Sequence, residues 1–225
     1  MIKLFFDIEQ GTEEWLAARC GILTASEIKL IVTPTLRTAS NNKERQHLYE
    51  LLAQRLTGYT EPCYISDDML RGPEDEVTAR IEYAEHYAPV TECGFITEDR
   101  FGFTIGYSPD GLVGDDGLIE CKSRRQKYQI QTILDGRVPD EYMLQCQTGL
   151  LVSGRKWLDF VSRCAGLPLF VVRVFPDAKI QDAIVSDATA FEIRLQDAMQ
   201  KYGEWRNNQA VLIDTIREVE QEITL

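Results

Sequence analysis

The sequence has few of the residues that metal and nucleophile sites most often use. Only two histidines, His47 and His86, occur among its 225 residues. None of the six cysteines forms a C-x-x-C pair, so a zinc ribbon or an iron–sulfur cluster with local ligands is not expected. Scattered cysteines in a chain of this size are typical of reduced thiols in a cytosol. No apolar run approaches the ~18 residues that span a bilayer, and the acidic N-terminus has no small-residue cleavage site. We therefore expect a cytoplasmic protein without a membrane segment.

Basic residues are also scarce. The chain has 24 Lys and Arg against 36 Asp and Glu, which gives a net charge of −12. Such an acidic chain is not expected to coat nucleic acid non-specifically. The charge is uneven, because residues 71–120 carry twelve acids and three bases, whereas residues 121–137 carry five bases and one acid. Carboxylates that hold cations beside bases that hold phosphates suit a metal-dependent phosphodiester enzyme, although an acidic surface with a chance basic cluster gives the same composition.

The expected fold is a single domain, since no repeat or long Pro/Gly/Ser linker divides the chain. Helical spacing and stop signals predict helices at 12–20, 43–57, 73–87, 126–135, 139–152 and 187–205, and a Thr24–Glu27 capping box predicts a short helix through Val32. Alternation and turn signals predict strands at 92–98, 101–107, 111–113, 118–122, 157–164 and 169–175. This order indicates an α/β (α+β) fold with a central mixed β-sheet flanked by helices. Residues 1–90 form a mainly helical part, 91–175 the sheet with its helices, and 176–225 a C-terminal helix and tail.

The stretch from Ser108 to Lys122 (SPDGLVGDDGLIECK) brings two carboxylates near each other. Its parts, Pro-Asp-Gly, Asp-Asp-Gly and Glu-x-Lys, are each common in turns and on exposed strands. If an odd-length turn joins two strands, with Gly117 in the left-handed position, paired residue numbers sum to an even value and Asp110 and Glu120 share a face. Ser108 and Lys122 then project from the same face. A two-residue turn would separate the carboxylates, so the site depends on the turn.

Two converging carboxylates repel each other unless a cation neutralises them, and hard oxygen ligands select Mg²⁺ or Mn²⁺ rather than zinc. A lysine two residues after the glutamate would lie beside that ion, where it can hold a water, accept its proton or stabilise charge on a phosphate. With an ordinary pKa near ~10.4, Lys122 would act as a base more readily at alkaline pH. The spacing Asp110-x(9)-Glu120-x-Lys122 resembles the PD-(D/E)xK nuclease motif, which implies a restriction-endonuclease-like core.

Four blocks, in order, resemble the lambda-type phage exonuclease family, which includes YqaJ-like viral recombinases and alkaline exonucleases. The blocks are residues 15–27 (WLAARCGILTASE), 71–76 (RGPEDE), 108–122 and 142–147 (YMLQCQ). The metal ligands that this resemblance implies are Asp110, Glu120, Glu76 and the backbone carbonyl of Cys121, with Lys122 as the catalytic lysine. The residues implied to bind a 5′-terminal phosphate are Arg19, Ser26, Ser108 and Gln145. The resemblance also implies two Mg²⁺ ions per site, which Mn²⁺ can replace, and a ring-shaped homotrimer.

Several of these positions have ordinary structural explanations when the residues are taken alone. Glu76 lies in the first turn of an expected helix, where the helix dipole favours acids. Ser26 fits a helix cap, Arg19 a solvated helix end and Gln145 the polar side of an amphipathic helix. Trp15 is expected in the core.

The motifs and the resemblance together predict a Mg²⁺-dependent 5′→3′ exonuclease of double-stranded DNA. It would start at a 5′-phosphorylated end and leave 3′ single-stranded DNA for recombination with a single-strand annealing protein. By resemblance, it is encoded by a phage or prophage and acts in the bacterial cytosol. The alternatives are a PD-(D/E)xK endonuclease of restriction or repair type, and a non-catalytic DNA-end-binding recombination scaffold.

Overall fold

A computed structural model of the chain describes residues 1–61, 67–208 and 212–217, with the backbone alone at residues 67–73 and 208. Its helices are α1 (Glu13–Arg19), α2 (Ile28–Ile31), α3 (Asn42–Thr57), α4 (Asp67–His86), α5 (Gln126–Asp135), α6 (Asp140–Ser153) and α7 (Ala178–Asn208). Its strands are β1 (Lys3–Phe5), β2 (Leu23–Thr24), β3 (Phe95–Glu98), β4 (Ile105–Tyr107), β5 (Gly111–Val113), β6 (Gly117–Ser123), β7 (Trp157–Arg163) and β8 (Phe170–Val174). Within these residues, no helix combines the length and the apolar character that a bilayer crossing requires.

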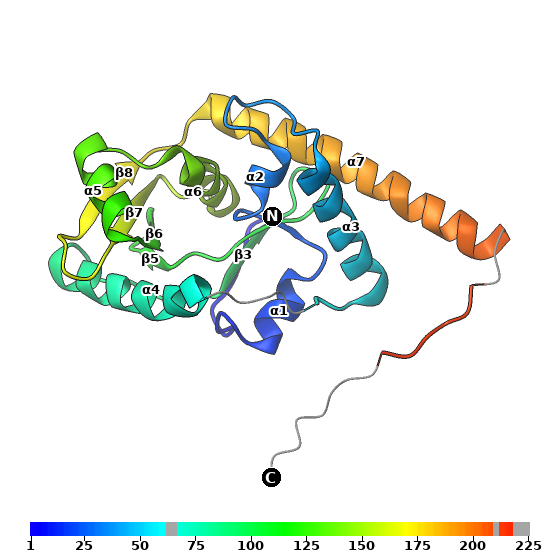
Figure 1. The fold of residues 1–225 in the computed structure, drawn as a ribbon, viewed down its shortest axis with the longest axis horizontal. Coiled ribbons are helices and arrows are strands. Elements are labelled where there is room, and N and C mark those ends of the chain that lie inside the picture. The colour runs from blue at the N-terminus through cyan, green and yellow to red at the C-terminus, as the bar shows by residue number, and fades with distance from the viewer. Residues whose placement is uncertain (62–66, 209–211, 218–225) are drawn as a thin grey trace, which may run out of the picture.

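The strands form two four-stranded sheets, with the orders β1-β3-β4-β2 and β5-β6-β7-β8. The pairs β2/β4 and β6/β7 are parallel, and the other neighbouring strands are antiparallel. In Figure 1, α7 runs over α2, α3 and α6, while α4 lies along the second sheet. The expected α/β class with mixed sheets and flanking helices is confirmed, with two sheets in place of a single central one.

Capping residues explain where the first long helix begins and ends. The Asn41 side chain accepts hydrogen bonds from the backbone N–H groups of Lys43 and Glu44, at 2.9 and 3.1 Å, which satisfies donors at the start of α3. Gly58 ends α3 in the left-handed conformation, with φ 66°. At α1, the Thr12 side chain accepts from the backbone N–H of Trp15 at 3.3 Å. The helices predicted at 43–57 and 12–20 are therefore confirmed.

Several elements differ from the sequence prediction, among them β4, which covers only the last three residues of the strand predicted at 101–107. Helix α4 begins at Asp67, so Pro73 lies within it and not in its first turn, at the cost of one i→i−4 hydrogen bond. The later turns of α4 compensate, because Ala79 and Tyr83 pack in one buried cluster with Ile119 of β6. Helix α7 begins at Ala178, well before the predicted start at residue 187. The strands β1 and β2 were not predicted, because two or three residues are too few to show alternation.

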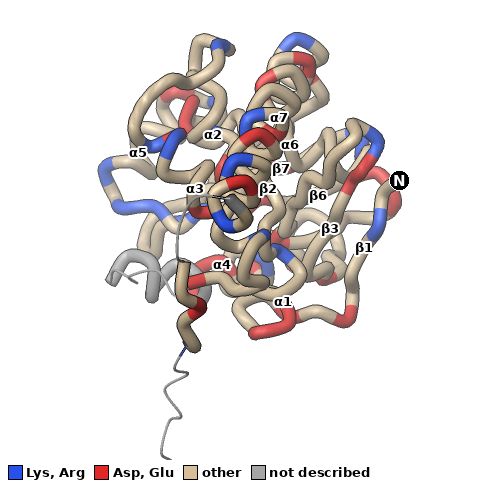
Figure 2. The backbone as a smooth tube through the Cα atoms, turned by 90° about the vertical axis from the view of Figure 1, so that its right-hand side faces the viewer, with Lys and Arg blue, Asp and Glu red and all other residues tan. Residues whose placement is uncertain are grey.

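Two buried clusters hold the layers together. The larger joins α2, α3, α6 and α7 to the first sheet and to β6 and β7, and the smaller joins α4 to β5, β6 and β7. Figure 2 shows acidic positions on α1 and α4 and a run of basic positions beside α5. The five cysteines within the described residues are free thiols, as expected, and the sixth, Cys63, lies outside them.

Candidate active site

A cavity of about 180 Å³ lies where the first sheet, the β5–β6 hairpin and helices α1, α4 and α6 meet. The eight predicted site residues whose side chains were expected to act all line it: Arg19, Ser26, Glu76, Ser108, Asp110, Glu120, Lys122 and Gln145. The structure thus brings together residues from four separate stretches of sequence. A larger groove of about 730 Å³ adjoins this cavity, and Gln10, Trp15, Glu76 and Asp110 line both.

The hairpin register sets the two carboxylates on one face, as predicted. Gly111 pairs with Ile119 and Val113 with Gly117, so paired numbers have an even sum and a three-residue loop, 114–116, joins the strands. The predicted left-handed residue was wrong. Gly114 has φ 52°, whereas Gly117 is a strand residue against which the Trp157 ring packs so closely that a Cβ would lie 2.2 Å from it. The odd loop length, and not the position of the glycine, determines which side chains share a face.

Glu120 is almost completely buried and is held by three side chains. The Lys122 ammonium lies 2.6 Å from its Oε1, the Gln145 amide donates to the same oxygen at 2.5 Å, and the Tyr107 hydroxyl donates to Oε2 at 2.7 Å. Asp110 is tied to the same strand, because the backbone N–H of Cys121 donates to its Oδ2 at 2.5 Å. Both carboxylates are therefore fixed to β6 and its neighbours, on rigid elements of the fold.

The charges around the cavity are unbalanced before any cation enters. Burial, together with the charge of Glu120, raises the pKa of Asp110 well above its ordinary value and raises that of Glu76 as well. Burial alone would lower the pKa of Lys122, but the charges of Glu120, Asp110 and Glu76 outweigh it and raise this pKa above its ordinary value. The expected ordinary pKa of Lys122 is therefore wrong. The carboxylates around Lys122 thus favour its ammonium form over the free base.

The donor chemistry of the cavity fits a divalent cation. The three carboxylates, Glu76, Asp110 and Glu120, outnumber the two cationic side chains of the cavity, Lys122 and Arg19, and carboxylate oxygens are the ligands that Mg²⁺ and Mn²⁺ prefer. Among the described residues, however, no three Asp, Glu, His or Cys side chains already surround one point as ligands. Lys122, Gln145 and Tyr107 occupy the oxygens of Glu120. A cation that binds Glu120 must therefore displace or share one of these contacts.

Arg19 is held at the other side of the cavity without a carboxylate. One guanidinium nitrogen donates to Ser108 Oγ at 3.1 Å, and the other makes a longer contact of 3.4 Å to Thr24 Oγ1. The guanidinium carbon of Arg19 lies 4.1 Å from the centre of the Trp15 ring, and the Trp15 indole N–H donates to the same Ser108 oxygen at 2.9 Å. Burial lowers the pKa of Arg19 and the charge of Glu27 opposes this shift, but none of the ion pairs in the described part of the chain involves Arg19. A partly desolvated guanidinium that makes no ion pair favours an anion.

Two details of this region differ from expectation. Trp15 was predicted in the core but is half-buried, because its ring covers Arg19 and its N–H reaches Ser108. The capping box is only half formed. The Glu27 carboxylate accepts from the backbone N–H of Thr24 at 2.9 Å, as in a capping box, but the Thr24 hydroxyl donates to that same carboxylate and does not accept from the backbone. Helix α2 has four residues, and the N–H groups of Thr24 and Glu27 are already bonded. The expected contact to a 5′-terminal phosphate therefore depends on Arg19 and the nearby hydroxyls.

Helix α6 carries two glutamines, Gln145 and Gln147, whose side chains have different partners. Gln145 faces Glu120, whereas Gln147 accepts from the backbone N–H of Asp177 at 2.9 Å and donates to the carbonyl of Phe175 at 2.8 Å. Residues two apart on a helix point in nearly opposite directions, which explains the division. Of the lining residues that sequence reasoning missed, Tyr107 could have been found from its position, because it directly precedes Ser108 at the end of β4.

Comparison with known proteins places this geometry in a family. Residues 14–156, more than half of the chain, match the model of the YqaJ-like viral recombinase domain. The chain is 36% identical to an alkaline exonuclease (LHK-Exo) from Laribacter hongkongensis, with a TM-score of 0.79 over 88% of this chain and 100% of that one. The same enzyme in complex with dAMP matches at 36% identity and a TM-score of 0.72, over 86% and 99% of the two chains.

A phage-related exonuclease from Haemophilus somnus 129PT is 14% identical, with a TM-score of 0.56 over 79% of this chain and 96% of that one, and shares the fold. No curated protein sequence matches the chain. The family match covers the four motif blocks and the cavity that they line. The chain therefore belongs to the YqaJ-like viral recombinase family.

Proposed function

We propose that this protein is a Mg²⁺-dependent exonuclease that degrades one strand of double-stranded DNA in the 5′→3′ direction from a 5′-phosphorylated end. The observation that carries the proposal is the composition of one cavity. Three carboxylates and a lysine lie at one side of it, and an arginine that makes no ion pair among the described residues lies at the other. The first group suits hydrolysis of a phosphodiester, and the second suits a terminal phosphate. The similarity to an alkaline exonuclease supports the same reaction class.

The residues divide the chemistry between them. Asp110, Glu120, Glu76 and the carbonyl of Cys121 would hold up to two Mg²⁺ ions, and Mn²⁺ offers the same preference for oxygen ligands. When bound, such ions neutralise phosphate charge and lower the pKa of a water. Lys122, as an ammonium group, stabilises charge on the phosphate and orients the attacking water.

The remaining residues of the cavity serve substrate binding. Arg19 offers two guanidinium nitrogens to a terminal phosphate, which fixes the register of the strand without reading its sequence. Ser26 and Ser108 add hydroxyl groups beside it, and Gln145 keeps the carboxylate of Glu120 in place. The distance between the two groups of residues would then set where the first phosphodiester bond meets the carboxylates.

The proposal extends to assembly and to biological context through the family resemblance. A ring of three copies would keep the enzyme on the duplex, and an annealing protein would take up the 3′ single strand. A phage or prophage protein of this kind would act in the bacterial cytosol. Its acidic surface, with a net charge of −12, disfavours broad adhesion to DNA and suits a protein that moves along it.

The test is digestion of matched DNA substrates. Linear duplexes with a 5′-phosphate or a 5′-hydroxyl, and a closed circle of the same sequence, are incubated with the protein in Mg²⁺ or EDTA. We expect release of mononucleotides from the 5′-phosphorylated linear duplex, only in Mg²⁺. Cleavage of the closed circle would favour an endonuclease of restriction or repair type. Binding of DNA ends without release of nucleotides would favour a non-catalytic recombination scaffold.

A further inference from the structure

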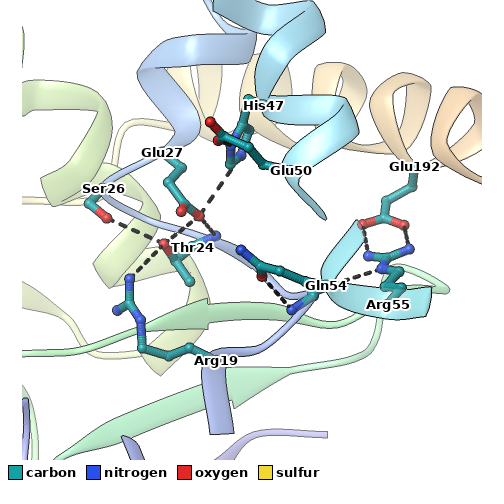
Figure 3. Close-up of polar contacts among 10 residues, drawn as sticks. Arg19, Thr24, Ser26, Glu27, His47, Glu50, Gln54, Arg55 and Glu192 are labelled. Atoms are coloured by element: carbon teal, nitrogen blue, oxygen red, sulfur yellow. Dashed lines mark hydrogen bonds and ion pairs between the residues drawn. The ribbon is translucent and has the colours of Figure 1, made fainter. Parts of the chain in front are cut away.

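The turn between α1 and β2 is bound on both sides by α3. The backbone N–H of Gly21 donates to the side-chain oxygen of Gln54 at 2.8 Å, and the Gly21 carbonyl accepts from Nε of Arg55 at 2.8 Å (Figure 3). Both polar groups of this one glycine are therefore used by two consecutive residues of another helix. Such an arrangement fixes the position of the turn as well as its shape.

Only glycine permits this close contact. Gly21 has φ 71°, in the left-handed region, and a Cβ there would lie 2.7 Å from Cγ of Arg55. The side chain of Arg55 thus lies directly over the turn. A substituted residue would strain the turn and push Arg55 away from it.

Arg55 is itself anchored to α7. Its two terminal nitrogens donate to the two carboxylate oxygens of Glu192 at 2.8 and 2.7 Å, and Glu192 is buried. With Nε on the Gly21 carbonyl and both terminal nitrogens on Glu192, the planar guanidinium bonds the turn and the carboxylate from three fixed nitrogens, a geometry that the single nitrogen of a lysine does not reproduce. The charge of Arg55 is neutralised by Glu192. It lies outside the set of residues that line the catalytic cavity, so it contributes no anion contact of its own there.

The turn leads directly to Arg19. Arg19 is the last residue of α1, two positions before Gly21, and its carbonyl accepts from the N–H of Ile22 at 3.0 Å, which closes the turn. On the other side of the turn, Thr24 contacts the Arg19 guanidinium at 3.4 Å and is held by Glu27. A displacement of Gly21 would therefore move both the arginine and the hydroxyl that it contacts.

We propose that Gln54 and Arg55, backed by Glu192, are positioning residues that hold the Gly21 turn and thereby aim Arg19 at the terminal phosphate. This inference rests on the proposed recognition of a 5′-phosphate. It assigns specificity for that end to two residues of α3 outside the cavity. Because the displaced groups are Arg19 and the Thr24 hydroxyl that it contacts, the effect should appear in end preference and not in catalysis as a whole.

The test uses two substitutions in the full-length protein and one matched control. Arg55→Lys keeps the charge opposite Glu192 and removes the bond to Gly21, and Gln54→Met removes the acceptor without touching the ion pair. The control is Arg194→Lys, because Arg194 pairs with buried Glu44 at 2.8 Å and so also joins α7 to α3, but does not contact the turn. Two measurements are made on each protein: the ratio of digestion rates, with KM, for 5′-phosphorylated and 5′-hydroxyl duplexes, and the ratio of binding affinities for the same ends in EDTA.

We expect both ratios to fall roughly three- to tenfold in Arg55→Lys and in Gln54→Met, through a higher KM for the phosphorylated end, the range typical for coupling between contacting residues. Arg194→Lys should keep the wild-type ratios. In an Arg19→Ala background, Arg55→Lys should change neither ratio further. If Arg55→Lys fails to fold, Gln54→Met decides alone.

The inference is overturned if wild type prefers the 5′-phosphate and the two α3 variants keep that preference. It is also overturned if Arg194→Lys lowers the ratios equally, because helix packing would then suffice. A wild-type protein that shows no preference for a 5′-phosphate, in rate or in binding, would overturn the proposed end recognition itself and the inference with it.

Discussion

Substitution of Asp110 by Asn should stabilise the protein in EDTA while it abolishes cleavage. The register of the β5–β6 hairpin, extended by one residue, sets Asp110 opposite Glu120, and directly paired side chains lie about 5 Å apart. Two unit charges at ~5 Å interact by about 3 kcal/mol at an effective dielectric constant of ~20. The ammonium of Lys122 offsets part of this. We therefore expect a net gain of about 1–2 kcal/mol at pH 8, since the Asn side chain can still accept the bond from the N–H of Cys121.

The effect should depend on pH with a definite sign. Because the pKa of Asp110 is raised in the folded protein, the folded state binds more protons than the unfolded state above pH ~3.9. In EDTA the wild type should therefore lose stability as the pH rises from ~3.9 toward the raised pKa. An Asn at this position cannot titrate. The difference between the two proteins should consequently be small near pH 4 and largest near pH 8.

Thermal unfolding in EDTA near pH 4 and at pH 8 measures this difference. For a domain of this size, a gain of 1–2 kcal/mol corresponds to a rise in Tm of roughly 2–8 °C. Addition of Mg²⁺ should raise the Tm of wild type at pH 8 and leave that of the Asp110→Asn protein nearly unchanged. The control is Asp115→Asn, in the exposed loop of the same hairpin, which should alter neither Tm nor activity. A lower Tm for Asp110→Asn at pH 8, or cleavage near the wild-type rate, would refute the reasoning.

Three further substitutions test the rest of the cavity. Lys122→Gln should be folded, should bind DNA ends and should be inactive, because an amide lacks the charge of the ammonium; turnover within tenfold of wild type would reduce Lys122 to a strand residue. Arg19→Ala should slow digestion of 5′-phosphorylated duplex by roughly ten- to a hundredfold, from the loss of a charged hydrogen bond of about 1.5–3 kcal/mol, and should affect 5′-hydroxyl duplex less. Equal losses on both duplexes would contradict the anion site. Tyr107→Phe should keep the fold and lower activity by about five- to tenfold, because Glu120 loses one of its three side-chain donors at a cost of about 1 kcal/mol; a change in steady-state rate below twofold would show that this donor is dispensable.

The sequence predicted the hairpin site well because its logic is local. The parity of a short loop fixes which side chains share a face, and this rule requires no knowledge of the rest of the fold. Asp110, Glu120 and Lys122 therefore line one cavity, as expected, even though the left-handed glycine was misplaced to Gly117.

Features that depend on contacts between residues far apart in the sequence could not be predicted from the sequence alone. The electrostatic environment of Lys122 includes Glu76 from α4, so its raised pKa required the tertiary structure. The placement of Trp15 depends on Ser108, which lies 93 residues away in sequence. The α3 contacts to Gly21 carry no sequence signature either, because a glutamine followed by an arginine on a helix is ordinary.

The short loop 114–116 has a consequence for how this family of sequences can change. Insertion of one residue there leaves Asp110 opposite Glu120 if the loop itself lengthens to four residues, but turns Asp110 to the opposite face if the strands slip by one position to keep a three-residue turn. The loop residues lie outside the cavity lining, so selection on them should act through the turn itself, as at Gly114 with its φ of 52°. The length of the loop should therefore vary among related chains while the pairing of Asp110 with Glu120 persists, and a relative in which the register has slipped should carry a compensating bulge or a relocated acid.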